Sequence, residues 1–310
     1  MPNAMMQMFV GGFAPDDEPD AFTFTDVTGQ NPSTAITSNS ITVTGINVAS
    51  DITVSGGTYS INGGAFTSSA GTVTKDDSVR VQVTTGSGFS TSYSATVTIG
   101  GVSDTFTATT KSPVSFSFTD HKFDTALSTS TTYTSVNIGS PAADRKVVLA
   151  VFDGAPITSV TVGGVTATRL VGYGPYYNTA IYQVNLPSGT TANVTVNTSA
   201  VANRSGIGVW AVYNAQSAAH ATSGNYQSNG IASTTIAIPA GGVAIGGGYD
   251  GGTGSSPTFS WSGLSEQYEY EYLSYAHTGA HLYAATANTP TVSLSTGAER
   301  GIAVASFAPA

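Results

Sequence analysis

The segment with the clearest chemical pattern alternates tyrosine with glutamate between Glu266 and Tyr275. On an extended strand such a pattern places phenols on one face and carboxylates on the other: Tyr268, Tyr270 and Tyr272, and Glu269 and Glu271. Phenols beside carboxylates can stack on sugar rings and accept their hydroxyl hydrogen bonds. We therefore predict ligand binding at these five residues. The alternative is that the tyrosines stabilise the strand by cross-strand pairing or are buried in a subunit interface.

The same glutamates are the natural candidates for glycoside hydrolysis. Residues two apart on a strand lie roughly 6–7 Å apart at Cα, so spacing alone does not exclude a catalytic pair. Glycosidases, however, place the two carboxylates on either side of a cleft. The Asp120-His121 segment suggests a Ser-His-Asp arrangement, but the chain has no Gly-x-Ser-x-Gly elbow. We predict a protein that is not an enzyme and has no catalytic residues.

Metal binding is the third chemistry that the residue types permit. His277 and His281 are four apart, which suits a metal pair on a helix, but Gly279 and the flanking strand pattern favour a hairpin. The acidic segments Asp16-Asp17-Glu18 and Asp250–Gly254 do not follow the EF-hand spacing. We predict solvated turns and hydrogen-bonded histidines, with no metal and no cofactor.

Composition predicts an all-β protein. Charged residues make up 9% of the 310, against about 25% in typical soluble proteins, and the chain is rich in Gly, with 36. The formal net charge of −9 would repel a phosphate backbone. We expect no nucleic-acid partner, and no membrane span, because no apolar run approaches 18 residues. With no Cys, stability must come from packing and strand pairing, helped by oligomerisation.

The chain is organised around a short joint, Lys111–Val114. Pro113 cannot donate to a sheet ladder and favours an extended conformation at Ser112. The Phe-x-Phe-Thr-Asp pattern after the joint, at Phe116–Asp120, repeats the one at Phe22–Asp26. We predict residues 111–114 to be a linker between two β-sandwich domains.

Residues 21–110 have the pattern of an immunoglobulin-like sandwich of about seven strands. Ser78–Val83 alternates strictly and places three valines on the core face. Asn62-Gly63 predicts a type I′ turn. The expected strands are Phe22–Thr25, Ser40–Thr44, Asp51–Ser55, Thr58–Ile61, Ser78–Thr84, Tyr93–Ile99 and Val102–Thr109.

This region resembles a recurrent bacterial and bacteriophage Ig-like module. The resemblance is carried by five stretches: Phe22–Asp26, Thr42–Ile46, Val54–Gly64, Asp76–Val81 and Thr98–Phe106. It implies a spacer or stalk on a surface or virion protein, and it implies no catalytic residue.

Residues 115–310 predict a larger sandwich of jelly-roll type. Val147–Phe152 is apolar on both faces, as a central strand should be. Strands alternate with Gly-rich turns up to Gly301–Phe307. A split into two smaller domains, with Gly241–Gly254 as the weak point, is the alternative. The block resembles the β-sandwiches of phage structural and tail-associated proteins.

Residues 1–20 differ from the rest and predict a docking arm. All four Met lie here, and flexible Met side chains fit irregular surfaces on a partner chain. The predicted docking residues are Met5, Met6, Met8, Phe9 and Phe13. The acidic run Asp16–Asp20 is expected to be a solvated spacer, and the alternative is a disordered tail. The segment has no Lys or Arg, so we expect no secretory signal.

These expectations combine into a virion structural protein, displayed on the particle surface as a capsid decoration or tail appendage. Its expected partners are other virion proteins, further copies of itself and host-surface glycan. Two alternatives stay open: a secreted or surface bacterial adhesin, and a polysaccharide-degrading enzyme with an Ig-like accessory module.

Overall fold

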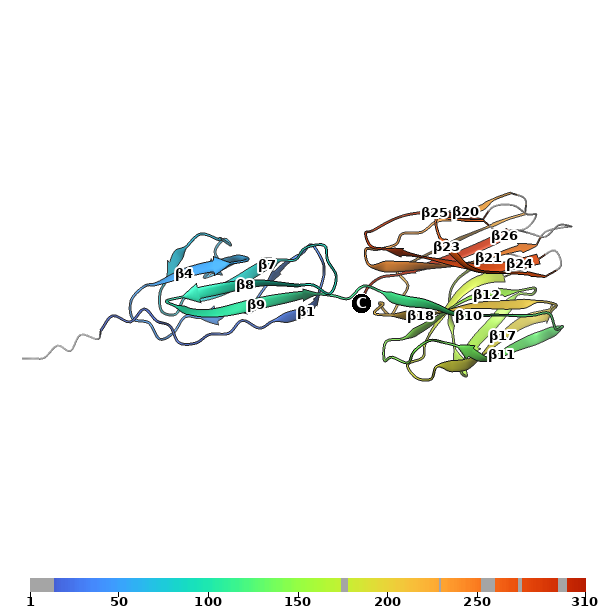
Figure 1. The fold of residues 1–310 in the computed structure, drawn as a ribbon, viewed down its shortest axis with the longest axis horizontal. Coiled ribbons are helices and arrows are strands. Elements are labelled where there is room, and N and C mark those ends of the chain that lie inside the picture. The colour runs from blue at the N-terminus through green and yellow to red at the C-terminus, as the bar shows by residue number, and fades with distance from the viewer. Residues whose placement is uncertain (1–13, 174–177, 229, 252–259, 273–274, 295–299) are drawn as a thin grey trace, which may run out of the picture. The chain divides into compact units, whose positions relative to one another are not determined.

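The computed structural model describes residues 14–173, 178–228, 230–251, 260–272, 275–294 and 300–310. Over these residues the regular structure consists of strands without any helix, which confirms the predicted all-β class (Figure 1). No helix in this part of the chain is therefore long and apolar enough to cross a membrane. The chain divides into two compact units, Met1–Lys111 and Ser112–Ala310.

Unit 1 is built from two sheets around one core. The first has the order β1-β9-β8-β4-β6, with β1 parallel to β9. In the second, β2 and β3 pair with one side of β7 and β5 with the other. The strands are β1 (Val27–Gln30), β2 (Ala35–Thr37), β3 (Ile41–Thr42), β4 (Ser50–Ser55), β5 (Thr58–Ile61), β6 (Gly71–Val73), β7 (Ser78–Thr84), β8 (Ser92–Ile99) and β9 (Val102–Thr110).

The sequence pattern of β7 explains the core of this unit. Val79, Val81 and Val83 are buried together, and Arg80 on the opposite face is exposed, as the alternation predicts. Asn62 and Gly63 both have positive φ, which confirms the predicted turn.

The acidic run Asp16–Asp20 has solvated carboxylates, as predicted, but its prediction as a spacer is wrong, because its backbone lies against unit 1. Asn47 donates its backbone N–H to the carbonyl of Asp16 (2.9 Å). Ser50 donates its hydroxyl to the carbonyl of Asp17 (2.7 Å), and Pro19 is buried. The backbone of this run satisfies its hydrogen bonds on unit 1, while its carboxylates remain in solvent.

Unit 2 carries the remaining strands. They are β10 (Ser115–Asp124), β11 (Ser128–Asn137), β12 (Lys146–Asp153), β13 (Ile157–Val162), β14 (Val165–Thr166), β15 (Thr168–Tyr173), β16 (Asn178–Asn185), β17 (Thr191–Ala202), β18 (Ser205–Tyr213), β19 (Ala221–Gln227), β20 (Ala232–Thr235), β21 (Gly242–Gly251), β22 (Trp261–Ser262), β23 (Ser265–Tyr272), β24 (Tyr275–Ala284), β25 (Thr291–Leu294) and β26 (Arg300–Phe307).

These strands form four stacked sheets, visible as layers in Figure 1. In stacking order they are β11-β17-β13-β14, β10-β18-β12-β16-β15, β19-β26-β21-β24-β23 and β20-β25-β22. Each of the three gaps between layers is filled by its own apolar cluster. The two middle sheets are therefore covered on both faces, which explains why β12, β21 and β26 are buried throughout.

The second half of unit 2 repeats the topology of the first. Replacing β10, β18, β12, β16 and β15 by β19, β26, β21, β24 and β23 reproduces the order of the five-stranded sheet. Replacing β11, β17 and β13 by β20, β25 and β22 does the same for the outer sheet. The sequence retains traces of this duplication, such as Ser205–Ala215 beside Arg300–Ala310.

The two halves pack about a pseudo-twofold axis. Asp153 of β12 pairs with Ser205 of β18, and Asp250 of β21 pairs with Arg300 of β26 in the same way. Asp153 and Asp250 are therefore equivalent, and so are Phe152 and Tyr249, which precede them. These two rings stack on each other with centroids 5.4 Å apart, and contact between equivalent residues is the mark of a twofold axis. The boundary between the halves lies between β18 and β19. The predicted weak point at Gly241–Gly254 is wrong, because Gly242–Gly251 forms the central strand β21.

Candidate functional site

The predicted tyrosine row lies on β23, an edge strand that faces β10 across the gap between the two middle sheets. The pairing of β10 with β18 shifts register between Phe118 and Asp120. The extra residue, Thr119, forms a bulge. Because of this bulge, His121 and Phe123 lie on the same face of β10 as Phe116 and Phe118. We call the result the aromatic seam: Phe116, Phe118, His121 and Phe123 of β10, and Tyr268, Tyr270 and Tyr272 of β23.

Tyr268 is the buried centre of the aromatic seam. Its ring is 7% exposed and stacks on Phe118 (5.4 Å) and His121 (5.3 Å). A Cβ on Gly208 or on Gly279 would lie 2.3 Å from Cε1 of this ring. Glycine at both positions therefore makes room for the phenol. Tyr268 is thus a packing residue, and only the rest of the row reaches the surface.

Tyr270 and Tyr272 are the exposed end of the aromatic seam, with 37% and 39% of their surface accessible. Phe123 stacks on Tyr270 with centroids 4.1 Å apart and lies 6.1 Å from Tyr272. This intrachain stacking holds the two phenols in place. Their accessible edges can contact an apolar or sugar ligand.

The two predicted carboxylates lie on the opposite face of β23. Glu269 pairs with Thr278 and Glu271 with Ala276, and both glutamates are exposed. The structure therefore separates the phenols from the carboxylates, as strand alternation requires. A third glutamate, Glu266, is exposed as a residue, but partial burial of its carboxyl raises its pKa, although a hydrogen bond from Thr278 opposes the effect.

His277 and His281 lie on one face of β24 with different partners. The hydroxyl of Tyr268 is 3.1 Å from Nε2 of His277, and Trp210 Nε1 donates to Nδ1 of His281 (3.0 Å). Burial, with a smaller effect of His121, lowers the pKa of His277 to about 3. Burial also lowers the pKa of His281. Over the described residues, no group of three or more His, Asp or Glu could hold a metal ion.

The prediction of a solvated turn at Asp250 is wrong, because Asp250 lies in β21 and is buried at one end of unit 2. The sequence interpretation did not single out Asp153, which is buried at the same end. Burial raises the pKa of Asp153 to about 6, and the charge of Arg204 opposes this. The equivalent Asp250 lies 3.4 Å from Arg300 in a buried ion pair. The repeated Phe-Asp-Gly and Tyr-Asp-Gly ends of β12 and β21 are the signal that points to them.

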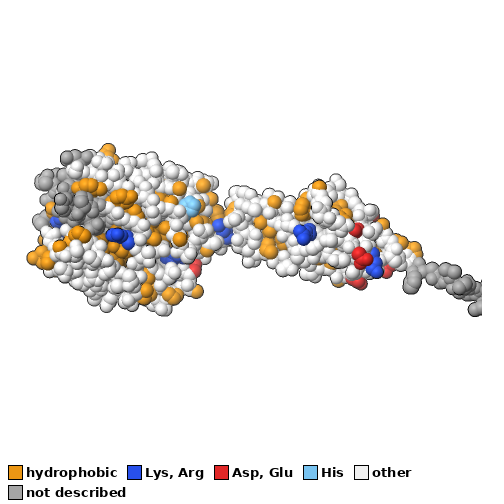
Figure 2. Space-filling view, turned by 180° about the vertical axis from the view of Figure 1, so that it is seen from behind, with side chains coloured by type: hydrophobic (Ala, Val, Ile, Leu, Met, Phe, Trp, Pro, Cys, Tyr) orange, Lys and Arg blue, Asp and Glu red, His pale blue; other side chains and the backbone are white. Residues whose placement is uncertain are grey.

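The same end of unit 2 also carries exposed apolar side chains, and we call it the apolar end. Figure 2 shows a surface of unit 2 on which charged side chains are sparse among hydrophobic and uncharged ones. Strand pairing places most of the exposed large hydrophobic residues of this unit at the strand ends near the buried charges: Leu127, Tyr173, Val201, Ile231, Tyr270 and Tyr272. Grouped apolar surface is typical of interaction sites.

The predicted docking residues Met5, Met6, Met8, Phe9 and Phe13 lie outside the described residues. No protein-family model and no curated protein matches this chain. The function is therefore inferred from the geometry of the two units.

Proposed function

We propose that the chain is a non-enzymatic structural protein of a bacteriophage particle, displayed on the virion surface as a capsid decoration or tail appendage. In this proposal unit 1 is an immunoglobulin-like module, because a sheet of β2/β3, β7 and β5 packs on one that contains β9, β8 and β4. Each half of unit 2 is a jelly roll in this proposal. In the sheets of both halves, strands from the beginning of the half lie beside strands from its end, as they do in two Greek keys.

The observation that carries the proposal is the four-layer build of unit 2. Its two middle sheets are covered on both faces, and apolar clusters fill all three gaps. Close-packed layers of this kind resist deformation, which suits a part that must keep its shape on a particle. The exposed apolar side chains gather at one end, where a surface-displayed protein would meet another molecule.

Within the proposal, Tyr270 and Tyr272 contact host-surface glycan, with Glu269 and Glu271 accepting hydrogen bonds from the edge of the same strand. Single contacts of this kind are weak, and many copies on one particle supply avidity. The N-terminal arm docks the protein to other virion proteins or to further copies of itself. Its apolar residues would otherwise cost roughly 25 cal/mol per Å² exposed.

The test uses particles purified from a producing culture and analysed by mass spectrometry. We expect the full chain at a fixed copy number relative to the major capsid protein, and loss of the protein from particles when residues 1–14 are deleted. Normal incorporation of the truncated chain contradicts the docking role. Recovery in the bacterial envelope, without particles, favours the adhesin alternative, and release of reducing sugar from host polysaccharide favours the enzyme.

A further inference from the structure

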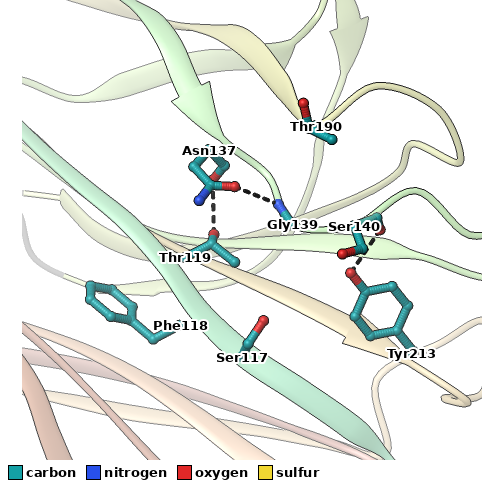
Figure 3. Close-up of a pocket in the computed structure, with 8 residues that line it drawn as sticks. All are labelled: Ser117, Phe118, Thr119, Asn137, Gly139, Ser140, Thr190 and Tyr213. Atoms are coloured by element: carbon teal, nitrogen blue, oxygen red, sulfur yellow. Dashed lines mark hydrogen bonds between the residues drawn. The ribbon is translucent and has the colours of Figure 1, made fainter.

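A pocket of about 470 Å³ opens beside β10 in the first half of unit 2 (Figure 3). This volume falls in the range of about 300–1,000 Å³ that is usual for small-ligand sites. Its lining contains no charged side chain and is dominated by hydroxyl and amide groups: Ser117, Phe118, Thr119, Asn137, Gly139, Ser140, Thr190 and Tyr213. Within the described chain, the hydroxyls of Ser117, Ser140 and Thr190 have no hydrogen-bond partner and are free to meet a ligand.

The pocket walls are fixed in advance by internal hydrogen bonds. Thr119 donates to the carbonyl of Asn137 (2.8 Å), and Tyr213 donates to the carbonyl of Ser140 (2.8 Å). The N–H of Gly139 donates to Oδ1 of Asn137 (3.0 Å). Of these three bonds, drawn in Figure 3, the first joins the wall to the edge strand β10, the second joins it to β18, and the third lies within the wall.

Arg145 ties the two loops of the wall together from behind. Its buried guanidinium donates to the carbonyls of Gly139 (2.7 Å) and Gly189 (2.8 Å). It also donates to those of Ser188 (2.7 Å) and Leu186 (2.7 Å). A charged donor that satisfies four carbonyls makes strong bonds, so a ligand would meet a preformed site and lose little affinity to ordering the protein.

The duplicated half provides an internal comparison for the pocket. Strand pairing and the equivalent hydrogen bonds of Ile138 and Ile236 align the two halves residue by residue. At four of the pocket positions the second half has residues without side-chain polar groups. The pairs are Ser117 and Ala221, Ser140 and Ile238, Thr190 and Pro290, and Tyr213 and Ala308. Ile238 is buried in the core. The fold therefore forms without these hydroxyls, and their presence in one half needs another reason.

We propose that this pocket binds one unit of a neutral saccharide. Hydroxyl groups both donate and accept, so they match a polyol, whose own hydroxyls do the same. With no cation in the lining, the pocket offers nothing to hold a phosphate or a carboxylate. The pocket shares Phe118 with the aromatic seam but contains none of the three tyrosines of β23. The inference does not depend on where the protein sits on a particle.

The experiment titrates the full chain, labelled with ¹⁵N, with a panel of neutral monosaccharides and disaccharides, with glucuronate and with inorganic phosphate. We expect at least one neutral sugar to shift the backbone amide signals of Ser117, Ser140 and Thr190, with a Kd on the order of 1 mM. Glucuronate and phosphate should leave these signals unchanged.

Two variants test the assignment. Ser140→Ile copies the second half and fills the pocket, and we expect it to weaken binding at least tenfold. Thr190→Val keeps the shape of the side chain and removes only the hydroxyl. It therefore tests whether the hydroxyl contributes to sugar binding while the fold is preserved. The matched control is Thr134→Ile, on the exposed side of β11, and it should bind as the unmodified protein does. Binding unchanged in both pocket variants, shifts confined to Tyr270 and Tyr272, or no shift with any neutral sugar overturns the proposal.

Discussion

Removal of the Tyr268 ring should destabilise unit 2 far more than removal of its exposed neighbour. Tyr268 is 7% exposed and stacks on two rings of β10, so Tyr268→Ala leaves a cavity between the middle sheets. Large-to-small changes at buried aromatic positions cost about 3–5 kcal/mol. Tyr270→Ala loses one stacking partner at a surface position, which is worth about 0.5–1.5 kcal/mol.

Urea unfolding followed by tryptophan fluorescence measures this difference. Both Trp residues of the chain, Trp210 and Trp261, lie in unit 2, so the signal reports this unit alone. We expect the midpoint for Tyr268→Ala to fall well below that for Tyr270→Ala, with Tyr268→Phe between them because it loses only the hydrogen bond to His277. Equal midpoints for the two alanine variants would refute the placement of Tyr268 at the centre of the aromatic seam.

Three further predictions follow from buried groups. Arg145→Met leaves four carbonyls without their donor and should lower the free energy of unfolding of unit 2 in the same urea assay, because each buried acceptor left unsatisfied costs about 1–3 kcal/mol. Gly208→Ala forces a Cβ to 2.3 Å from a buried ring and should lower the urea midpoint; an unchanged midpoint would contradict the close packing. The pKa of His277 is lowered to about 3 in the folded protein. Between pH 3 and about 6.5, this histidine therefore binds a proton in the unfolded chain but not in the folded one. Stability should therefore fall as the pH drops through that window, by up to about 1.4 kcal/mol per unit. Asp153, with its pKa raised to about 6, acts in the opposite sense, because its contribution declines as the pH rises from about 4 to 6. His277→Gln should flatten the acid limb of the stability curve, and the exposed control His220→Gln should not.

The sequence was sufficient to locate those strands whose own hydrophobic pattern reflects which of their faces are buried. Strict alternation located β7, with the predicted bounds Ser78–Thr84, and the continuous apolar run Val147–Phe152 located the centre of β12. β19 was missed because Ala221–Gln227 has neither pattern. It is an edge strand whose residues are mostly half-buried, so its hydrophobicity is not periodic.

The site was less predictable because its partners are distant in sequence. The alternation of β23 correctly separates phenols from carboxylates, but it does not reveal that Tyr268 meets Phe118 on another sheet. The bulge at Thr119 also changes which residues of β10 face it. The duplication was not predicted from the sequence, because equivalent residues of the two halves differ where their surroundings differ. Ser140, for example, lines a pocket, whereas its equivalent Ile238 is buried in the core. Only strand order and hydrogen bonding identify these positions as equivalent.

The most direct test of the structural role is labelling of intact particles. An antibody against unit 2, coupled to gold and imaged by electron microscopy on purified particles, should mark regularly spaced positions on the outer surface of the capsid or tail. Particles from a culture that expresses the chain without residues 1–14 should carry no label. Label on the bacterial envelope with bare particles would contradict the account.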